Sequence, residues 1–298
     1  MVTIKKKQIG RKTYYYLGHT YRQHGKVMYK ETYVGDKIPT GIENVKREFL
    51  QQIYKEKWFG SFEKIRLEYT KELKKTPQEV LQKNIEAFMI AFTYNTNRIE
   101  GSKLSFKDTA LLLEHGITPK DKPIGDVKET EAHRKTFYDM LNYKGDLSIG
   151  IVLKWHRALF EETKPGIAGK IRDYQVYITG TKYKPPSAIE VQAYLLELFR
   201  WYEREKGALN PVELAALTHV KFEAIHPFGD GNGRIGRLIM NFVLHRNGYP
   251  MLNVPYLNRR GYYNALEKAQ VKKIDSIFVL WFFRRYLKEY KTYLNSIN

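Results

Sequence analysis

Apolar residues recur at helical spacing through all but the N-terminal part of the chain, and this periodicity constrains the fold more than any other feature. Val45, Phe49 and Ile53 share one stripe, and another runs from Leu214 to Ile225. With 298 residues, 43% of them hydrophobic, the chain has enough apolar material for one large domain, or for a core domain with a small appendage. The prediction is a mainly α protein with a helical bundle as its body.

Residues 1–40 differ from this body, because aromatic and β-branched residues cluster there around a glycine-containing turn. The runs are Tyr14–Leu17, Val27–Tyr29 and Thr32–Val34, and the turn is Gln23–Lys26. They predict a small N-terminal β-hairpin or three-stranded meander. A hairpin of this size is unstable alone, so we expect it to pack on the helical body or to pair with another chain. We favour a cap on the core over a partner-binding arm, because tyrosine-rich hairpins pack well without a ligand.

Helical spacing is interrupted a second time, between residues 169 and 186. Glycine and β-branched residues without a helical period indicate a second β-hairpin in this segment. The pair Pro185–Pro186 ends it, and a helix is expected over residues 188–206.

The chain is strongly basic, with a formal net charge of +19 and a pI near 9.7. Such a charge favours nucleic acid, a nucleotide or an acidic protein surface as partner. The lysines are spread along the whole chain, which also suits general solvation and life at high temperature. We therefore rank dedicated nucleic-acid binding below that explanation, without excluding it.

The absence of cysteine excludes disulfides, thiolate zinc sites and thiol catalysis, so any metal must be bound by oxygen or imidazole. No apolar run reaches the roughly 18 to 20 residues that a membrane span requires. The basic start Met1–Lys7 is followed by polar residues, unlike the apolar region of a secretory signal. We expect a cytoplasmic protein with no membrane contact.

Chemistry is concentrated in the segment His226–Arg234, between two well-marked helices. Three glycines at alternate positions let backbone N–H groups turn inward as a nest for an anion. The nest leads into a helix N-terminus, where unpaired N–H groups and the helix dipole also attract phosphate. Arg237 follows Arg234 by one helical turn, so two guanidinium groups lie on one side of the nest. This arrangement suits two neighbouring phosphates.

Asp230 is a lone acid in this cationic loop, which indicates a hard cation between its carboxylate and the phosphates. Mg²⁺ binds in that way, with one or two carboxylates and phosphate oxygens. His226 immediately precedes the nest, and imidazole titrates near neutrality as a general base should. A buried structural histidine is the poorer explanation, because a histidine, an acid, an asparagine, three glycines and two arginines fall within twelve positions.

The segment His226–Arg234 matches the signature HPFx[D/E]GNGR of the Fic domain at every fixed position, so the chain resembles the Fic family. The similarity extends to Gly169–Arg172 with Val176-x-Ile178 and Pro185–Pro186, and to Tyr262-Tyr263-x-x-Leu266. These segments look like the family's flap and its nucleotide-facing helix. The resemblance implies a Fic-type helical bundle with a β-hairpin flap near the active site.

The expected organisation has five parts. They are residues 1–40 as the N-terminal hairpin or meander, 41–85 as connecting helices, 86–104 as an inhibitory helix segment, 105–275 as the Fic core domain, and 276–298 as a C-terminal helix.

The resemblance further implies a protein adenylyltransferase, which moves AMP from Mg·ATP onto a Tyr, Thr or Ser hydroxyl of a protein. His226 would deprotonate the hydroxyl, which attacks the α-phosphorus as pyrophosphate leaves, and Asp230 would hold Mg²⁺ between the α- and β-phosphates. The implied nucleotide-binding residues are Phe228 as the anchor of the loop, Gly231 and Gly233 through their N–H groups, Asn232 at the α-phosphate, Arg234 and Arg237 along the polyphosphate, and Tyr262 and Tyr263 at the adenine and ribose. The flap would pair with an extended target segment through Val176, Tyr177, Ile178 and Tyr183.

Upstream, the run from Thr96 to Gly101 resembles the family's inhibitory motif [S/T]xxxE[G/N]. The resemblance implies that Glu100 pairs with Arg237 and so removes a guanidinium group from the γ-phosphate. Gly101 would let the helix end there. Glu100 is expected to be a brake, and it could also position water for removal of AMP.

Two alternatives remain open. Relatives of the same fold transfer phosphate or phosphocholine, but those that use the nucleotide as phosphate donor typically have lysine at the position of Gly233. From another class, a basic nucleotide-sensing or DNA-binding adaptor would need no general base, and the presence of His226 argues against it. The sequence does not identify the target protein; the chain itself is one candidate, and a homo-oligomer is a further open partner.

Overall fold

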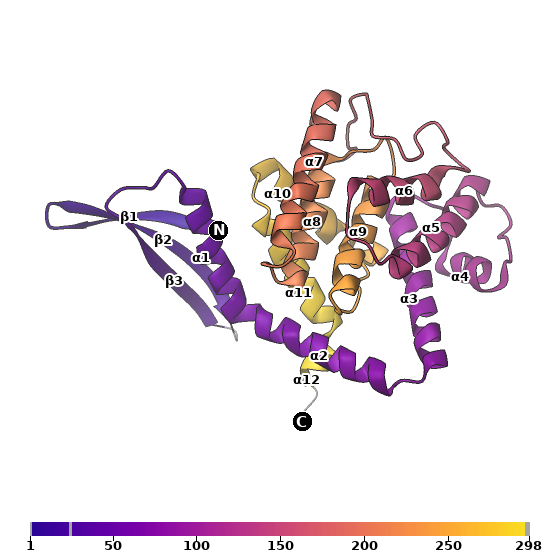
Figure 1. Ribbon diagram of the computed structural model, residues 1–298, viewed down its shortest axis with the longest axis horizontal. Helices are drawn as coiled ribbons and strands as arrows, with labels where there is room; N and C mark the ends of the chain where they lie inside the picture. The colour runs from indigo at the N-terminus through magenta and orange to yellow at the C-terminus, as the bar shows by residue number, and fades with distance from the viewer. Residues whose placement is uncertain (1, 24–25, 296–298) are drawn as a thin grey trace. The chain divides into compact units, whose positions relative to one another are not determined.

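The structure is a computed structural model, and it describes residues 2–23 and 26–295 (Figure 1). In chain order the elements are β1 (Thr3–Ile9), β2 (Lys12–Gln23), β3 (Lys26–Gly35), α1 (Ile42–Tyr54), the π-helix η1 (Lys55–Phe59), α2 (Gly60–Lys75), α3 (Gln78–Ile99), α4 (Phe106–His115), α5 (Ile124–Asn142), α6 (Ile149–Phe160), α7 (Ala188–Glu205), α8 (Pro211–Ile225), α9 (Asn232–Arg246), the 3₁₀-helix η2 (Tyr256–Asn258), α10 (Arg259–Lys272), α11 (Ser276–Glu289) and α12 (Lys291–Asn295). They form two compact units, Met1–Lys64 and Ile65–Asn298.

The first unit contains the predicted meander, a three-stranded antiparallel sheet in the order β1-β2-β3. Leu17 on β2 and the α1 residues Phe49 and Ile53 form its buried core, so α1 covers one face of the sheet. This packing supplies the apolar contact that a small sheet lacks alone. The prediction of a β-meander is confirmed; His24 and Gly25 of the predicted turn lie outside the described residues.

The second unit is a helical bundle built around α9. In Figure 1, α9 lies between α8 on one side and α5 and α6 on the other, and contacts confirm these neighbours. Asn210 caps α8 by accepting from the backbone N–H of Val212, with Pro211 as its first residue. Pro227 cannot continue the helix, so α8 ends at Ile225 and a short loop leads into α9. The prediction of a mainly helical fold is confirmed.

The expected second β-hairpin is not present, because residues 170–187 form a loop without paired strands. The backbone groups of this loop find partners elsewhere. Arg172 N–H donates to the Pro227 carbonyl over 3.0 Å, and Lys182 N–H donates to Glu267 Oε1 over 2.9 Å. Contacts with neighbouring loops and helices therefore replace the cross-strand ladder that β-branched residues alone suggested.

The C-terminal segment 276–298, expected as one helix, contains two helices up to residue 295. Tyr290 separates them, because its φ of −102° departs from the helical value. Residues 296–298 lie outside the described part of the chain. Within that part, no helix combines the length and apolarity needed to cross a bilayer.

Candidate active site

The loop between α8 and α9 is held in shape by its own backbone and by buried polar side chains. Asn232 accepts from Phe228 N–H (2.9 Å) and donates to the Phe228 carbonyl (2.8 Å). The Phe228 ring is fully buried and stacks on His156 at 3.8 Å between centroids. Arg172, almost fully buried, donates through Nε to the His226 carbonyl over 2.9 Å. Phe228 thus anchors the loop, whereas both polar groups of Asn232 are engaged by the loop itself.

His226 is the residue directly after α8, and its backbone has the left-handed conformation, with φ of +50°. Its side chain is 20% exposed. Burial lowers the pKa of His226 to about 4, although a hydrogen bond to the Glu223 backbone opposes this shift. The imidazole is therefore neutral at pH 7. With Nδ1 near Glu223, Nε2 is the nitrogen that can accept a proton.

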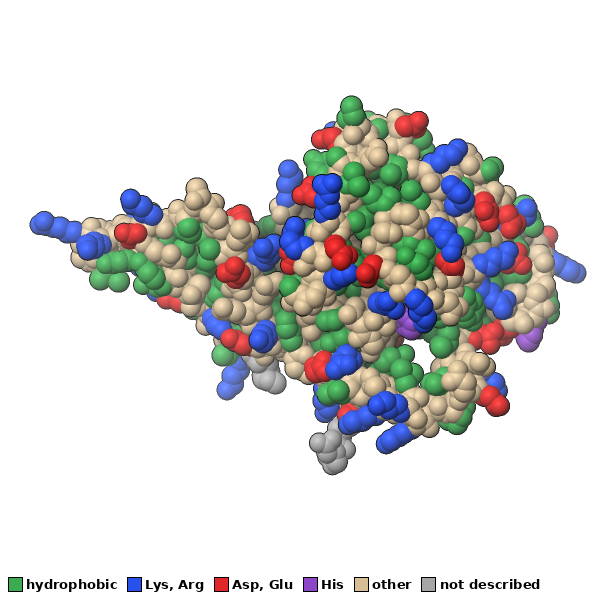
Figure 2. All heavy atoms as spheres, viewed as in Figure 1, with side chains coloured by type: hydrophobic (Ala, Val, Ile, Leu, Met, Phe, Trp, Pro, Cys, Tyr) green, Lys and Arg blue, Asp and Glu red, His purple; other side chains and the backbone are tan. Residues whose placement is uncertain are grey.

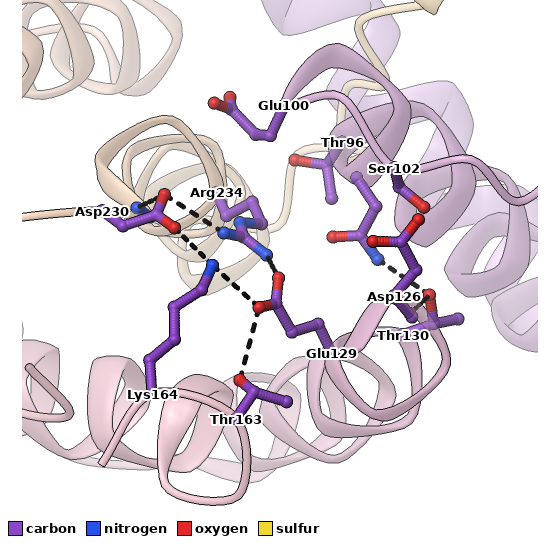
Figure 3. A network of polar contacts seen from close by, with 12 residues as sticks. Thr96, Glu100, Ser102, Asp126, Glu129, Thr130, Thr163, Lys164, Asp230 and Arg234 are labelled. Atoms are coloured by element: carbon purple, nitrogen blue, oxygen red, sulfur yellow. Dashed lines mark hydrogen bonds and ion pairs between the residues drawn. The ribbon is translucent and has the colours of Figure 1, made fainter. Parts of the chain in front are cut away.

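Asp230 lies in a network of charges that reaches across three segments of the chain (Figure 3). Lys164 Nζ is 2.6 Å from Asp230 Oδ2 and 3.0 Å from Glu129 Oε1 on α5. Glu129 also pairs with the buried Arg234, which is 3.4 Å from Asp230 Oδ1. Burial alone would raise the pKa of Asp230, but Arg234 and Lys164 hold it below its ordinary value. The carboxylate of Asp230 is thus ionised and already neighboured by two cations.

The N-terminus of α9 offers backbone N–H groups without a capping side chain. Gly231 precedes it with φ of +80°, and a Cβ there would collide with the Phe160 ring. A Cβ on Gly233 would collide with Glu100 Oε1 and approach Arg237 Nη1. Gly231 is required by its positive φ and by the Phe160 ring, whereas a side chain at Gly233 would have to displace Glu100. The carboxylate of Glu100 lies directly over the first turn of the helix.

The predicted pair between Glu100 and Arg237 is present, at 2.6 Å between Oε1 and Nη2. Arg237 is 1% exposed and also donates to Thr96, through Nε to Oγ1 (2.7 Å) and through Nη2 to the carbonyl (3.2 Å). Its Nη1 lies 3.4 Å from the Tyr262 hydroxyl. Thr96 on α3 and Glu100, the residue directly after α3, therefore occupy the guanidinium group that was predicted to bind phosphate. Gly101 follows with φ of +101°, as expected where a helix has ended.

Tyr262 and Tyr263 were predicted to line the adenine and ribose site, and the structure places them differently from each other. Tyr262 is 1% exposed, and its hydroxyl lies 2.8 Å from His219 Nε2. Tyr263 is 44% exposed and donates to the Ile99 carbonyl at the end of α3 (3.2 Å). Of these two tyrosines, therefore, only Tyr263 has a ring surface that a ligand could contact.

The flap residues lie on the loop that replaces the expected hairpin. Tyr177 is largely exposed, Val176 and Ile178 are half-buried, and Tyr183 donates to the Ala224 carbonyl over 2.8 Å. Ala224 belongs to the last turn of α8, two residues before His226. Tyr183 thus connects this loop to the helix that carries His226.

A cavity of about 280 Å³ lies beside the loop. Its lining is Asn97, Glu100, Gly101, Ser102, Gly125, Asp126, Glu129, Lys164, Asp230 and Arg234. The carboxylates of this lining outnumber its cations, so a polyphosphate would meet net repulsion there without an added cation. Among the described residues, no group of three or more His, Cys, Asp or Glu could hold a metal by itself.

Sequence reasoning missed Glu129, Lys164, His156 and Arg172. Each contacts the loop from a distant part of the chain, and Glu129, Lys164 and His156 lie in none of the motifs described above. Arg172 alone carried a signal, because it belongs to the segment Gly169–Arg172 that resembles the flap.

Comparisons with known proteins agree with this geometry. Residues 146–244 match the Fic/DOC family. The protein adenylyltransferase fic-1 of Caenorhabditis briggsae is 34% identical over 186 residues, which cover 60% of this chain and 36% of that protein. The protein adenylyltransferase Fic of Drosophila yakuba is 34% identical over 180 residues, covering 59% and 36%. The chain therefore spans little more than a third of the length of these relatives.

Solved structures show the same fold. A Fic domain-containing signalling protein of Bacteroides thetaiotaomicron superposes with a TM-score of 0.70 at 29% identity, covering 77% of this chain and 94% of that one. A Fic-1 fragment from Caenorhabditis elegans superposes with a TM-score of 0.67 at 26% identity, covering 86% and 73%. Together with the complete loop signature, these comparisons show that residues 146–244 are similar to the Fic/DOC family and that the helical bundle has the fold of Fic-domain proteins.

Proposed function

We propose that the chain transfers AMP from Mg·ATP to a hydroxyl group of a protein. The observation that carries the proposal is a neutral, partly exposed His226 next to a glycine-rich loop that opens onto the uncapped N-terminus of α9. Relatives named protein adenylyltransferases are 34% identical over 59% to 60% of the chain. Nucleotide binding alone would not require a base at this position.

The reaction needs one proton acceptor and one anion-binding surface. The target hydroxyl gives its proton to Nε2 of His226 as its oxygen forms a bond to the α-phosphorus. The bond from that phosphorus to the bridging oxygen breaks, and pyrophosphate leaves. The N–H groups at the start of α9 and the guanidinium of Arg234 stabilise the charge that develops on the phosphate oxygens.

Asp230 fits a role in binding Mg²⁺, because it is ionised and borders the acidic cavity. One or two carboxylates plus phosphate oxygens and water are the usual ligands of this ion. When bound, the ion neutralises phosphate charge. Glu129 is a further carboxylate of the cavity lining, joined to Asp230 through Lys164.

Glycine at position 233 favours AMP transfer over phosphate transfer. Relatives of the fold that use the nucleotide as phosphate donor typically have lysine at that position. Here a single added Cβ would meet Glu100 Oε1 and approach Arg237 Nη1, so a lysine would have to displace the Glu100 carboxylate.

Labelled ATP tests the proposal directly. The protein is incubated with Mg²⁺ and either α- or γ-labelled ATP, with and without a cell extract as a source of targets, and intact-protein mass is recorded. We expect label from the α-position only, with a mass increase of one AMP on a target or on the chain itself. Label from the γ-position would identify a kinase instead.

The low pKa of His226 predicts an unusual pH profile. Protonated imidazole cannot accept a proton, so the rate should fall only as the pH drops through about 4, where His226 becomes charged. We expect kcat/KM for AMP transfer to stay level between about pH 6 and pH 8. Circular dichroism at each pH serves as the folding control. A fall centred near pH 6.5, the ordinary value for histidine, would contradict the assignment.

Lys164 is expected to compete with a divalent cation for Asp230. Although partial burial lowers the pKa of Lys164, its bonds to Asp230 and Glu129 raise it above the ordinary value, so the ammonium is charged. In Lys164→Met these carboxylates lose a neighbouring cation. Free Mn²⁺, followed by electron paramagnetic resonance without nucleotide, should then bind about three- to tenfold more tightly than in the wild type.

Lys154→Met is the matched control, because it removes an ammonium that pairs with Asp139 at a similar distance of 2.7 Å, away from the cavity lining. Its Mn²⁺ affinity should equal that of the wild type. Equal affinities in Lys164→Met and the wild type would show that Lys164 does not compete for the site.

A further inference from the structure

The two faces of the N-terminal sheet differ in what covers them. Leu17 and its α1 partners bury one face. The opposite face carries alternate residues of all three strands. We name six of them the tyrosine face: Lys5, Lys7, Tyr14, Tyr16, Tyr29 and Tyr33. Glu31 lies on the same face, between Tyr29 and Tyr33. Tyr29 and Tyr33 are 45% and 54% exposed. Large aromatic rings on an exposed sheet surface are a feature of binding surfaces.

The rings and ammonium groups of the tyrosine face are interleaved. Tyr33 lies 5.4 Å from Tyr16 between ring centroids. Lys5 Nζ lies 4.3 Å from the Tyr29 centroid, and Lys7 Nζ lies 4.3 Å from the Tyr16 centroid. Gly18 leaves room for Tyr29 to lie across β2, because a Cβ there would approach the tyrosine hydroxyl. Two rings of the face, Tyr16 and Tyr29, therefore each have an ammonium group beside them.

Charge on these strands is almost entirely positive. The cations within residues 2–35 are Lys5, Lys6, Lys7, Arg11, Lys12, Arg22, Lys26 and Lys30, against the single carboxylate Glu31. Glu31 is held by Lys7 and Tyr29. On the side of the molecule seen in Figure 2, by contrast, Lys and Arg over the helical part are interspersed with acids. Residues 2–35 therefore carry a net positive charge, although lysines occur along the whole chain.

We propose that the tyrosine face binds single-stranded nucleic acid. Unpaired bases stack on tyrosine rings, and the phosphates between them pair with lysine ammonium groups. A duplex would offer phosphates to the lysines but no unpaired bases to the tyrosine rings, so it should bind more weakly than a single strand. A second copy of the chain would bring Lys5 and Lys7 against the same cations, which repel. The proposal does not depend on AMP transfer, because the tyrosine face lies in the other compact unit.

Fluorescence anisotropy with the full-length protein tests the proposal, using labelled 12-nucleotide single strands of mixed sequence, as DNA and as RNA, and a duplex of equal length. Tyr29→Leu/Tyr33→Leu should weaken single-strand binding by about tenfold or more. Tyr29→Phe/Tyr33→Phe keeps the rings and should bind like the wild type. This pair separates stacking from folding, and circular dichroism and Tm of each variant confirm the fold.

Charge is tested by Lys5→Gln/Lys7→Gln, which should reduce the slope of log K against log salt by about 1 to 1.5. The matched control Lys74→Gln/Lys75→Gln removes the same charge from exposed positions at the end of α2 and should leave the slope and affinity nearly unchanged.

Three results would overturn the proposal. One is equal affinity of the leucine variant and the wild type, and another is duplex binding as tight as single-strand binding. The third is binding of an acidic peptide, such as a glutamate 12-mer, with no measurable single-strand binding. AMP transfer measured in parallel should be the same in all four double variants.

Discussion

Replacing His226 is expected to lower AMP transfer by about 10²- to 10⁴-fold, the usual contribution of a positioned general base. Without the imidazole the target hydroxyl loses the proton acceptor that His226 supplies at the end of α8. The loop itself should persist, because Arg172 binds the His226 carbonyl and Asn232 binds the backbone of Phe228. None of these contacts uses the imidazole.

The choice of variant matters because His226 has a positive φ. Alanine in this conformation costs about 1–2 kcal/mol, whereas asparagine tolerates it better. His226→Asn is therefore the sharper variant, with His226→Ala as its companion. kcat and kcat/KM should fall together, while the Kd for ATP stays within about twofold of the wild type. A His226→Asn protein that keeps more than a tenth of the activity would exclude His226 as the base.

Local motifs allowed the sequence to predict the centre of the site. His226–Arg234 is one continuous loop, so its helices, its glycine positions and its end at α9 follow from adjacent residues. Glu100 and Arg237 are 137 residues apart in the sequence. Their pairing was predicted because the resemblance to the Fic family implied it. Spacing alone could not have joined two charges so far apart.

The surroundings of the site were not predictable in the same way. Lys164 reaches Asp230 from 66 residues away, and Glu129 reaches Arg234 from 105. In a chain with 51 Lys and Arg residues, a lone lysine or glutamate carries no signal of its partner. The prediction of a hairpin for the flap was wrong for a related reason. The hydrogen-bond partners of its backbone N–H groups, Pro227 and Glu267, belong to distant segments.

Asn232 shows how burial refines a predicted role. The family resemblance placed it at the α-phosphate, but both of its polar groups bind Phe228 and it is 2% exposed. Its contribution is therefore to hold the loop that presents Gly231 and Gly233. Tyr262 is similar, since its hydroxyl is bonded to His219 and lies beside Arg237 in the interior.

Glu100→Gly is expected to raise AMP transfer by about tenfold or more. The carboxylate lies over Gly233 at the start of α9 and pairs with Arg237, so one anion already occupies the place where a polyphosphate should bind. Removing it frees a fixed guanidinium group that Thr96 still orients. Arg237 can then pair with a phosphate in place of Glu100. A gain of about 1.4 kcal/mol from this pair corresponds to a tenfold higher rate of AMP transfer.

The same change should destabilise the protein without nucleotide. Arg237 is 1% exposed, and loss of Glu100 leaves its charge partly uncompensated in the interior, at a cost of about 1–3 kcal/mol. We therefore expect a lower Tm for Glu100→Gly and a larger rise in Tm on addition of Mg·ATP than in the wild type. Glu100→Gln, which keeps the shape but not the charge, should lie between them in both measurements. An unchanged rate of AMP transfer in Glu100→Gly, with the Tm lowered as expected, would show that the pair is structural and that Glu100 is not a brake.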